Sequence, residues 1–304
     1  MKSPISISFS VSDNYSQHLA VVLTSFLVNN PDSQFVFHVL HRNVSEENQA
    51  QIRKLESMYT NCEIKFHLLD ANTFEKFAIP LYLEHVTVET YFRYCLPDLL
   101  CDEIRTIYSD VDVICRSDIR EIWEVDLAGK IMAAVRNCEG EQAGQQNDIV
   151  RLGFSPNSPY FFTGFLVMDL ERMREEKTSQ RWISATEKYG NQVSFIDLDI
   201  MNLVCEGDIY EIDRVWNETA QYSPFRRNVK IWHFPGFTLK PWCNIWKNTT
   251  WPIYLKYLLK SPYKSNALSF ILGHIKGFFY FKYTKKQVTR YLVCGIRVFR
   301  RKEM

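Results

Sequence analysis

The chain has 304 residues, 46% of them hydrophobic, which is enough to bury a sizeable core. Its formal net charge of +1 combines a mildly acidic body with a basic tail, a distribution that excludes a general nucleic-acid-binding protein. The eight cysteines are scattered without a Cys-x-x-Cys pair, which indicates reduced thiols and excludes a disulfide framework and a cysteine zinc site.

The N-terminal segment lacks the long apolar core of a signal peptide. No stretch reaches the roughly 18 uninterrupted apolar residues that a membrane-spanning helix requires. The best candidate, residues 269–283, is interrupted by His274, Lys276 and Lys282. We therefore expect a cytoplasmic protein without a membrane-spanning helix.

Strand and helix patterns alternate through the first seventy residues. Apolar residues alternate or run together as in strands over 5–11, 35–40 and 62–69, and recur at helical spacing over 15–28 and 45–59. This alternation predicts an α/β fold with a mostly parallel sheet. No Gly-x-Gly-x-x-Gly follows the first strand, which argues against a dinucleotide-binding enzyme.

A polar segment follows the first predicted strand. Its residues are Ser12, Asp13, Asn14 and Tyr15, whose side chains could hydrogen-bond a base and stack on it. The same residues also suit an Asx turn that caps the next helix. Both interpretations stay open at this point.

Two carboxylates follow a buried strand predicted over 104–108. Asp110 and Asp112 are separated only by Val111, and two ionised carboxylates cannot both be core residues unless they are paired or bind a metal. Ligands of open α/β sheets bind at the carboxyl ends of strands, where this pair is expected. Carboxylate oxygens suit Mg²⁺ or Mn²⁺, although a pair of Asp residues in a surface turn is the simpler alternative.

Further elements are predicted along the rest of the chain. Residues 87–100 form a helix, 130–135 a strand, 140–158 a polar loop and 160–169 a long buried strand. Gly164 inside that strand indicates the close approach of a ligand or of a second backbone. Asp197 and Asp199 begin a later helix, where capping alone could explain Asp199.

Seven motifs occur in an order that resembles the family 8 glycosyltransferases. These retaining galactosyl- and glucosyltransferases include bacterial lipopolysaccharide enzymes and, more remotely, glycogenin. The resemblance covers about residues 5–255. It implies one Rossmann-like nucleotide-sugar-binding domain of GT-A type, which we place at residues 1–260. The motifs are Asp-Asn-Tyr at 13–15, Thr-Tyr-x-Arg at 90–93, Tyr-x-Asp-x-Asp at 108–112, Tyr-Phe-x-x-Gly at 160–164, Asp-x-Asp-x-x-Asn at 197–202, Trp-Asn at 216–217, and His-Phe-x-Gly at 233–236 before Lys240-Pro241-Trp242.

The resemblance also implies roles for individual residues. Asp110, Asp112 and His233 would ligate Mn²⁺, with Mg²⁺ as the other candidate. Catalytic roles would fall to Arg93, which contacts the donor, to Asp197, which faces the transferred sugar, and to the Leu198 position, where the family often has Gln. The UDP-sugar would be bound by Ser10, Ser12, Asp13, Asn14, Tyr15, Asp110, Val111, Gly236 and Lys240, with Tyr15 stacked on uracil and Gly236 and Lys240 on the diphosphate.

Three departures from the family pattern concern the donor site. Phe162 replaces an Asn or small polar residue, Leu198 replaces the Gln, and the spacing from His233 to Lys240 is one residue longer than usual. Phe162 and Leu198 put the donor sugar in question, and the loss of the Gln at Leu198 also favours attack by the acceptor on the front face. They also support an alternative function, a non-catalytic nucleotide-sugar or glycan-binding relative of the same fold.

The C-terminal segment, residues 261–304, is predicted to be a helical, basic extension. Its last 24 residues carry eight Lys or Arg against one Glu. On a helix, one face would carry Lys286, Arg290, Arg297 and Arg301, and the opposite face Val288, Tyr291, Leu292, Val298 and Phe299. Such a helix suits the surface of an anionic membrane, although a helix packed on the body is the alternative.

Together these features predict a retaining transferase that uses UDP-galactose or UDP-glucose. Its acceptor would be a lipid-linked or oligosaccharide substrate in lipopolysaccharide or other surface-glycan synthesis. The enzyme would be peripheral on the inner face of the cytoplasmic membrane.

Overall fold

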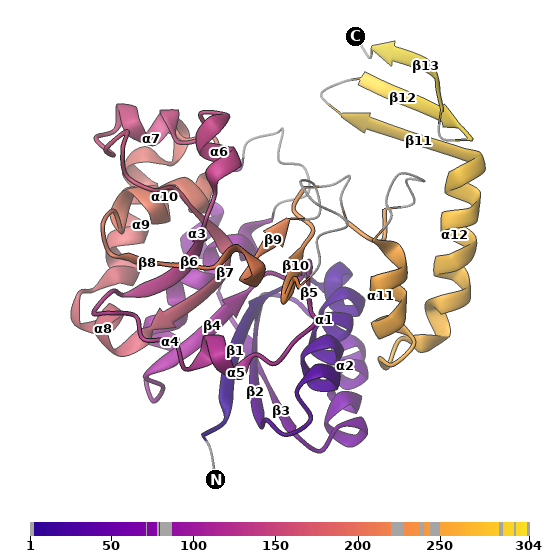
Figure 1. Ribbon diagram of the computed structural model, residues 1–304, viewed down its shortest axis with the longest axis horizontal. Helices are drawn as coiled ribbons and strands as arrows, with labels where there is room; N and C mark the ends of the chain where they lie inside the picture. Colours follow the sequence, from indigo (N-terminus) through magenta and orange to yellow (C-terminus); the bar gives the residue numbers. More distant parts are fainter. Residues whose placement is uncertain are drawn as a thin grey trace.

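A seven-stranded sheet forms the centre of the protein (Figure 1). The computed structural model describes residues 3–70, 72–77, 79, 87–219, 228–236, 240–243, 250–285, 288–294 and 296–302. The strand order is β3-β2-β1-β4-β7-β6-β8, and only β7 runs antiparallel to its neighbours. The predicted α/β fold with a mostly parallel sheet is confirmed. The strands are β1 (Ile5–Ser10), β2 (Phe35–His41), β3 (Cys62–Leu68), β4 (Arg105–Ser109), β6 (Met132–Arg136), β7 (Phe161–Asp169) and β8 (Ile209–Ile212).

Helices cover both faces of this sheet (Figure 1). Alternate residues of β4 belong to different cores, because successive side chains of a strand point to opposite faces. Ile107 packs in the core that includes α1 and α2, whereas Tyr108 packs in the core that includes α9 and α10. The helices are α1 (Ser16–Asn29), α2 (Glu46–Met58), α3 (Asn72–Glu75), η3 (Val88–Cys95), α4 (Leu96–Leu99), α5 (Arg120–Trp123), α8 (Leu170–Glu175), α9 (Thr178–Tyr189) and α10 (Ile196–Val204).

Local sequence explains where the first helices begin and end. In α1 the buried Leu19, Val22 and Phe26 recur at helical spacing, and the helix ends at Asn29, two residues before Pro31. In α2 the side chain of Ser45 caps the helix by accepting a hydrogen bond from the Asn48 N–H.

The expected loop over 140–158 differs from the structure. It contains most of α6 (Cys138–Gln142) and all of α7 (Asn147–Arg151). Each of these helices is five residues long, too short for an apolar period to appear in the sequence. The Asn137 side chain caps α6 at the Gly140 N–H.

A small second sheet brings the last site residues to the carboxyl end of β4. It consists of β5 (Val113–Cys115), β10 (Ile231–His233) and β9 (Glu218–Thr219), in that order. Because β10 pairs antiparallel with β5 and places His233 opposite Val113, His233 lies beside Asp112.

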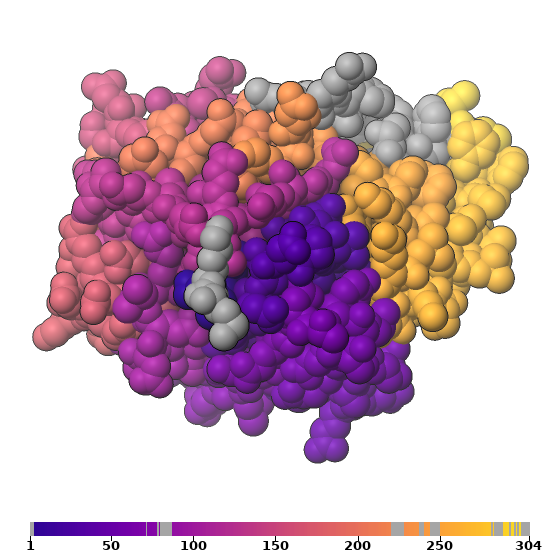
Figure 2. All heavy atoms as spheres, turned by 60° about the horizontal axis from the view of Figure 1, so that its bottom comes forward, coloured from indigo at the N-terminus to yellow at the C-terminus, as the bar shows by residue number. Residues whose placement is uncertain are grey.

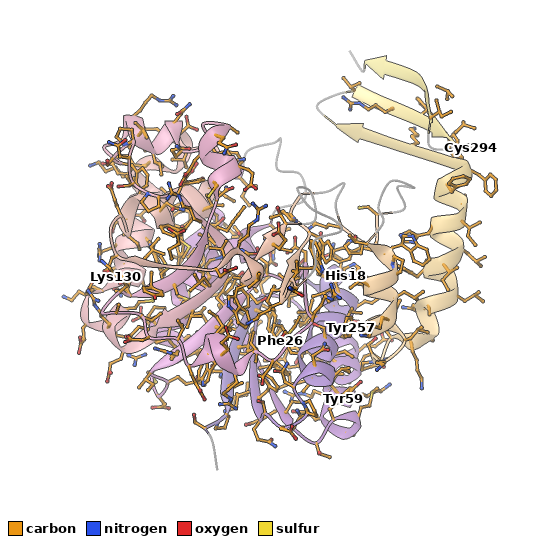
Figure 3. The ribbon with its side chains drawn as sticks, viewed as in Figure 1. His18, Phe26, Tyr59, Lys130, Tyr257 and Cys294 are labelled. Atoms are coloured by element: carbon orange, nitrogen blue, oxygen red, sulfur yellow. The ribbon has the colours of Figure 1, made fainter. Side chains whose placement is uncertain are left out.

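The part of the chain after residue 250 packs against α1 and α2 at one side of the molecule (Figure 2, orange and yellow). The Asn29 amide donates to Tyr257 Oη over 2.9 Å, and Tyr59 Oη donates to the Lys260 carbonyl over 2.9 Å. Figure 3 shows Tyr257 and Tyr59 in this junction, with Cys294 far from it. This part of the chain includes α11 (Trp251–Leu258) and, within the C-terminal segment of residues 261–304, α12 (Ala267–Phe279) and the antiparallel strands β11 (Tyr280–Lys285), β12 (Val288–Val293) and β13 (Ile296–Lys302).

The predicted helix over the basic tail is wrong, because the described basic residues after Lys276 lie on β11, β12 and β13, whereas Lys286 lies outside the described residues. In the described part of this tail, α12 is the α-helix that agrees with the prediction. The tail is rich in Val, Ile, Tyr and Phe, which favour strands, and Cys294, at φ +46°, turns the chain between β12 and β13. Within the described residues, no helix is both long enough and apolar enough to cross a membrane.

Candidate active site

A cavity of about 430 Å³ opens at the carboxyl ends of β1 and β4. Segments far apart in the sequence meet there: the residues after β1, helix η3, the turn after β4, strand β7, the start of α10 and the residues around β10. This is the position at which open α/β sheets bind ligands.

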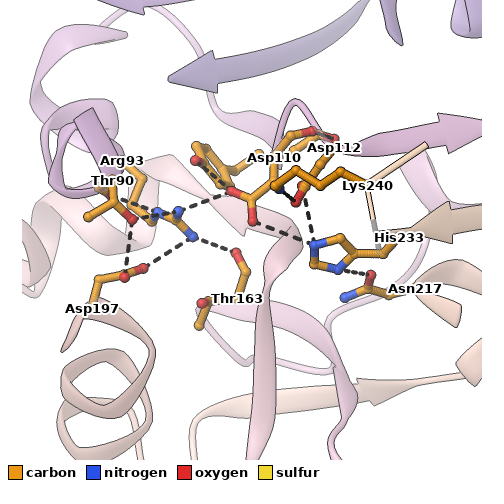
Figure 4. A network of polar contacts seen from close by, with 11 residues as sticks. Thr90, Arg93, Asp110, Asp112, Thr163, Asp197, Asn217, His233 and Lys240 are labelled. Carbon is orange, nitrogen blue, oxygen red and sulfur yellow. Dashed lines mark hydrogen bonds and ion pairs between the residues drawn. The ribbon is translucent and has the colours of Figure 1, made fainter. Parts of the chain in front are cut away.

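Asp110, Asp112 and His233 meet at one wall of this cavity (Figure 4). One ligand atom of each lies within 4.8 Å of the others. His233 Nε2 is 3.3 Å from Asp112 Oδ1 and 3.8 Å from Asp110 Oδ2. Asn217 Oδ1 lies 2.9 Å from His233 Nδ1 and, as an amide oxygen, accepts a hydrogen bond from it, so Nε2 is the ring nitrogen that faces the two carboxylates.

This donor set fits a divalent cation. Two carboxylate oxygens and an imidazole nitrogen are ligands that Mn²⁺ accepts, and a polar partner on the remote ring nitrogen is usual for metal-bound His. Gly164 leaves the room that the arrangement needs. A Cβ at that position would lie 2.5 Å from His233 Cε1 and 2.6 Å from Asp110 Oδ2. In the structure these two side chains approach Gly164, whereas the sequence suggested a ligand or a second backbone.

Lys240 contributes a positive charge to the same wall. Its Nζ lies 2.5 Å from Asp112 Oδ2, and both side chains are buried. Burial alone would raise the pKa of Asp112, but the Lys240 ammonium and the His233 ring outweigh it and hold that pKa well below its usual value. Asp112 is therefore ionised, as a metal ligand must be.

Arg93 connects Asp110, beside Asp112 and His233, to Asp197 (Figure 4). The guanidinium is buried and donates to Asp110 Oδ1 over 3.1 Å and to the Thr163 carbonyl over 2.7 Å. It also lies 3.3 Å from Asp197 Oδ2 and 4.2 Å from the centre of the Tyr108 ring. Arg93 thus fixes the relative position of the two carboxylates on either side of the cavity.

Asp197 lies at the first turn of α10. Thr90 Oγ1 donates to Asp197 Oδ1 over 3.1 Å, and burial raises the pKa of Asp197 despite Arg93. The preceding Ile196 has φ +35°, a strained conformation for a β-branched residue. Asp199, in contrast, accepts hydrogen bonds from the Phe195 N–H and from Tyr160 Oη, so the capping role predicted for it is confirmed.

The predicted nucleotide residues divide into two groups. Ser10, Ser12 and Tyr15 line the cavity, and the Tyr15 ring packs edge-on against Trp242. Asp13 and Asn14 are not among the lining residues. Asp13 Oδ1 accepts from the Ser45 N–H and the Asn48 amide, both over 2.8 Å, at the start of α2. The other predicted residues that line the cavity are Arg93, Asp110, Val111, Asp112, Asp197, Leu198, His233, Gly236 and Lys240.

Several residues of the site carried no assigned role in the sequence prediction. Thr90 donates to Asp197, the Thr163 carbonyl accepts from Arg93, and Asn217 orients His233. Thr90 and Asn217 belong to the motifs quoted above, which was the available signal. The Thr163 contact uses a backbone carbonyl, for which the sequence has no signal.

Comparisons with known proteins agree with this architecture. The family model described as Glycosyl transferase family 8 matches residues 6–246. General stress protein A of Bacillus subtilis is 26% identical over 267 residues, which cover 81% of this chain and 90% of that protein. The lipopolysaccharide 1,3-galactosyltransferase of Salmonella typhimurium is 24% identical over 276 residues, covering 86% and 80%. The crystal structure of the galactosyltransferase LgtC with donor and acceptor sugar analogs has a TM-score of 0.74 at 24% identity, over 84% of this chain and 96% of that chain.

Proposed function

Since the chain belongs to glycosyltransferase family 8, we propose that it transfers galactose or glucose from a UDP-sugar to a saccharide acceptor with retention of configuration. The observation that carries the proposal is the cluster of Asp110 with the buried Asp112 and His233, beside Lys240. A protein that only bound glycans would have no need of such a site for a diphosphate.

The residues of the cavity suit departure of a nucleoside diphosphate. Asp110, Asp112 and His233 would hold Mn²⁺, which when bound neutralises charge on the diphosphate. Lys240 would bind the same diphosphate and add a second positive charge without proton transfer. Arg93 would contact the donor and keep Asp197 oriented toward the transferred sugar.

The donor and acceptor are proposed from the relatives and from the cavity. A relative named as a lipopolysaccharide 1,3-galactosyltransferase supports a hexose donor and a surface-glycan acceptor. Ser10, Ser12 and Tyr15 would contact the uridine. Phe162 and Leu198, which also line the cavity, replace hydrogen-bonding groups with apolar ones, so they would affect the choice between galactose and glucose.

The test is UDP release by the full chain with Mn²⁺ and a panel of UDP-sugars. We expect slow hydrolysis of UDP-galactose or UDP-glucose that a chelator abolishes. Asp112→Asn should reduce that rate by at least roughly a hundredfold, because the charge of a buried metal ligand is lost. Tight, Mn²⁺-dependent binding of UDP without release from any donor would instead identify the non-catalytic relative.

We also propose that the C-terminal segment, residues 261–304, attaches the enzyme to the anionic inner face of the cytoplasmic membrane. Lipid-linked acceptors would be available there. Support comes from α12, which exposes Leu268, Leu272, Ile275 and Phe279 at a spacing of four, three and four residues. These residues form one apolar face, and Lys276 and Lys282 are exposed near its end.

A further inference from the structure

Glu89 is a buried acid of the cavity to which neither the motifs nor the proposed reaction assigns a role. It lies in η3, is 2% exposed and lines the cavity. Its Oε1 accepts a hydrogen bond from Arg42 Nε over 3.0 Å. Its Oε2 is also buried, and among the described residues it has no hydrogen-bond partner.

An unpaired carboxylate oxygen in a buried position needs an explanation. Leaving such a group without a partner is unfavourable, and nearly all buried polar atoms are hydrogen-bonded. Arg42 satisfies one oxygen only, and the same guanidinium lies 3.7 Å from Glu75 on the exposed side. A ligand in the cavity would complete the coordination of Oε2.

Glu89 lies near the residues expected to contact the nucleoside end of a bound nucleotide sugar and near those expected to contact its hexose end. Helix η3 contacts β1 and β2. Ser10 and Ser12, at the end of β1, line the same cavity. The next residue in η3, Thr90, donates to Asp197, which is expected to face the transferred sugar. Glu89 therefore lies between the nucleoside end and the hexose end of the cavity.

The chemistry of the carboxylate limits what it can bind. An ionised carboxylate only accepts hydrogen bonds, so its partner must be a donor. The diphosphate is excluded because it carries negative charge, whereas ribose and hexose both offer hydroxyl groups. Carboxylates bind ribose hydroxyls in other nucleotide-binding α/β folds.

We propose that Oε2 of Glu89 accepts a hydrogen bond from a hydroxyl group of the nucleotide-sugar donor. The proposal rests on the proposed function, because it takes a UDP-sugar as the occupant of the cavity. It adds a specificity residue on η3.

The experiment measures binding of UDP, 2′,3′-dideoxy-UDP, UDP-galactose and UDP-glucose to the full chain with Mn²⁺ by calorimetry. Glu89→Leu removes both carboxylate oxygens, and Arg42, which is 38% exposed, can be hydrated in the variant. Glu75→Gln is the matched control, because it removes the other ion pair of Arg42 without touching the cavity. Thermal melting of each variant reports whether the fold is kept.

We expect Glu89→Leu to weaken binding roughly tenfold to a hundredfold, the loss of one hydrogen bond to a charged group, and Glu75→Gln to have no effect. A loss for UDP that disappears with 2′,3′-dideoxy-UDP assigns the bond to ribose. A loss confined to the UDP-hexoses assigns it to the transferred sugar. Unchanged affinity, or an equal loss for UDP and 2′,3′-dideoxy-UDP, overturns the proposal. Failure of the unmodified chain to bind UDP would instead refute the proposed function.

Discussion

Gly164 controls the distance between Asp110 and His233, because both side chains occupy the space where its Cβ would be. Gly164→Ala should therefore push one ligand away and lower Mn²⁺ affinity by roughly tenfold to a hundredfold. Titration of Mn²⁺ in the presence of UDP measures this. The control is Gly190→Ala, whose added Cβ meets only Thr186 Cγ2 at 3.4 Å. Equal Mn²⁺ affinity in the two variants would contradict the arrangement.

His67 should make the stability of the fold depend on pH. It lies on β3 with its Nε2 3.0 Å from His38 Nδ1, and His38 Nε2 is 2.7 Å from Glu103. Burial, with His38 and Lys65 nearby, lowers the pKa of His67 from 6.5 to about 4 despite Glu103. Between these two values the unfolded chain binds the proton and the folded chain does not, so the free energy of unfolding falls as the pH falls.

His67→Gln removes this titration and should flatten the dependence between about pH 6.5 and pH 4. Urea unfolding of both proteins at several pH values within that interval measures the effect. The slopes should converge above pH 6.5, where His67 is neutral in both states. A variant whose stability falls as steeply as that of the unmodified chain would show that another group titrates.

At the scale of elements, α12 holds the segment that carries Lys240. His274 Nε2 lies 2.9 Å from the Pro241 carbonyl, and its Nδ1 lies 2.9 Å from the Phe270 carbonyl, so the ring can hydrogen-bond either carbonyl oxygen. The next residue, Trp242, stacks on His18 at a ring distance of 3.6 Å. Because Lys240 precedes Pro241, the contact from α12 fixes the backbone beside the ammonium that meets Asp112.

His274→Phe keeps a ring in this position but cannot donate to Pro241. We expect it to raise the KM for the UDP-sugar roughly tenfold, the loss of about one buried hydrogen bond, with a smaller change in kcat. His274→Gln retains a donor and should recover most of the affinity. Steady-state kinetics of both variants separates this positioning effect from a general loss of stability, because a loss of stability would lower the activity of both variants alike.

The elements also show how far sequence reasoning reaches. The strand before Asp110 and the helix of Leu19, Val22 and Phe26 were predictable, because each has one clear apolar period. The tail was not, because apolar residues over 288–299 suit both a helical face and an alternating strand. A helix would place the basic residues of the tail next to one another on one face. The β-branched residues of β12 and β13 instead favour pairing between strands.

At the scale of the whole molecule, the candidate site depends on contacts that no local pattern contains. Asp110 and His233 were linked through a resemblance, but Asn217 and Gly164, which orient them, meet only when β7, β9 and β10 assemble. Glu89 was not predicted for the same reason. In the sequence Glu89 lies within a predicted helix. The folded structure shows that Arg42, just after β2, binds one of its carboxylate oxygens and that the other has no partner among the described residues.

The apolar face of α12 predicts that the whole protein binds anionic membranes. Leu272 and Ile275 are 54% and 50% exposed, and burying such side chains contributes about 1 kcal/mol or more each. A variant with both changed to Ser should therefore float with anionic liposomes roughly tenfold less. The matched control changes Leu68 and Ile104, which are 72% and 69% exposed on other elements. Neutral liposomes or high salt should weaken flotation of the unmodified chain, because each Lys or Arg near an anionic surface contributes about 1 kcal/mol. Equal flotation of the two double variants would show that α12 does not contact the membrane.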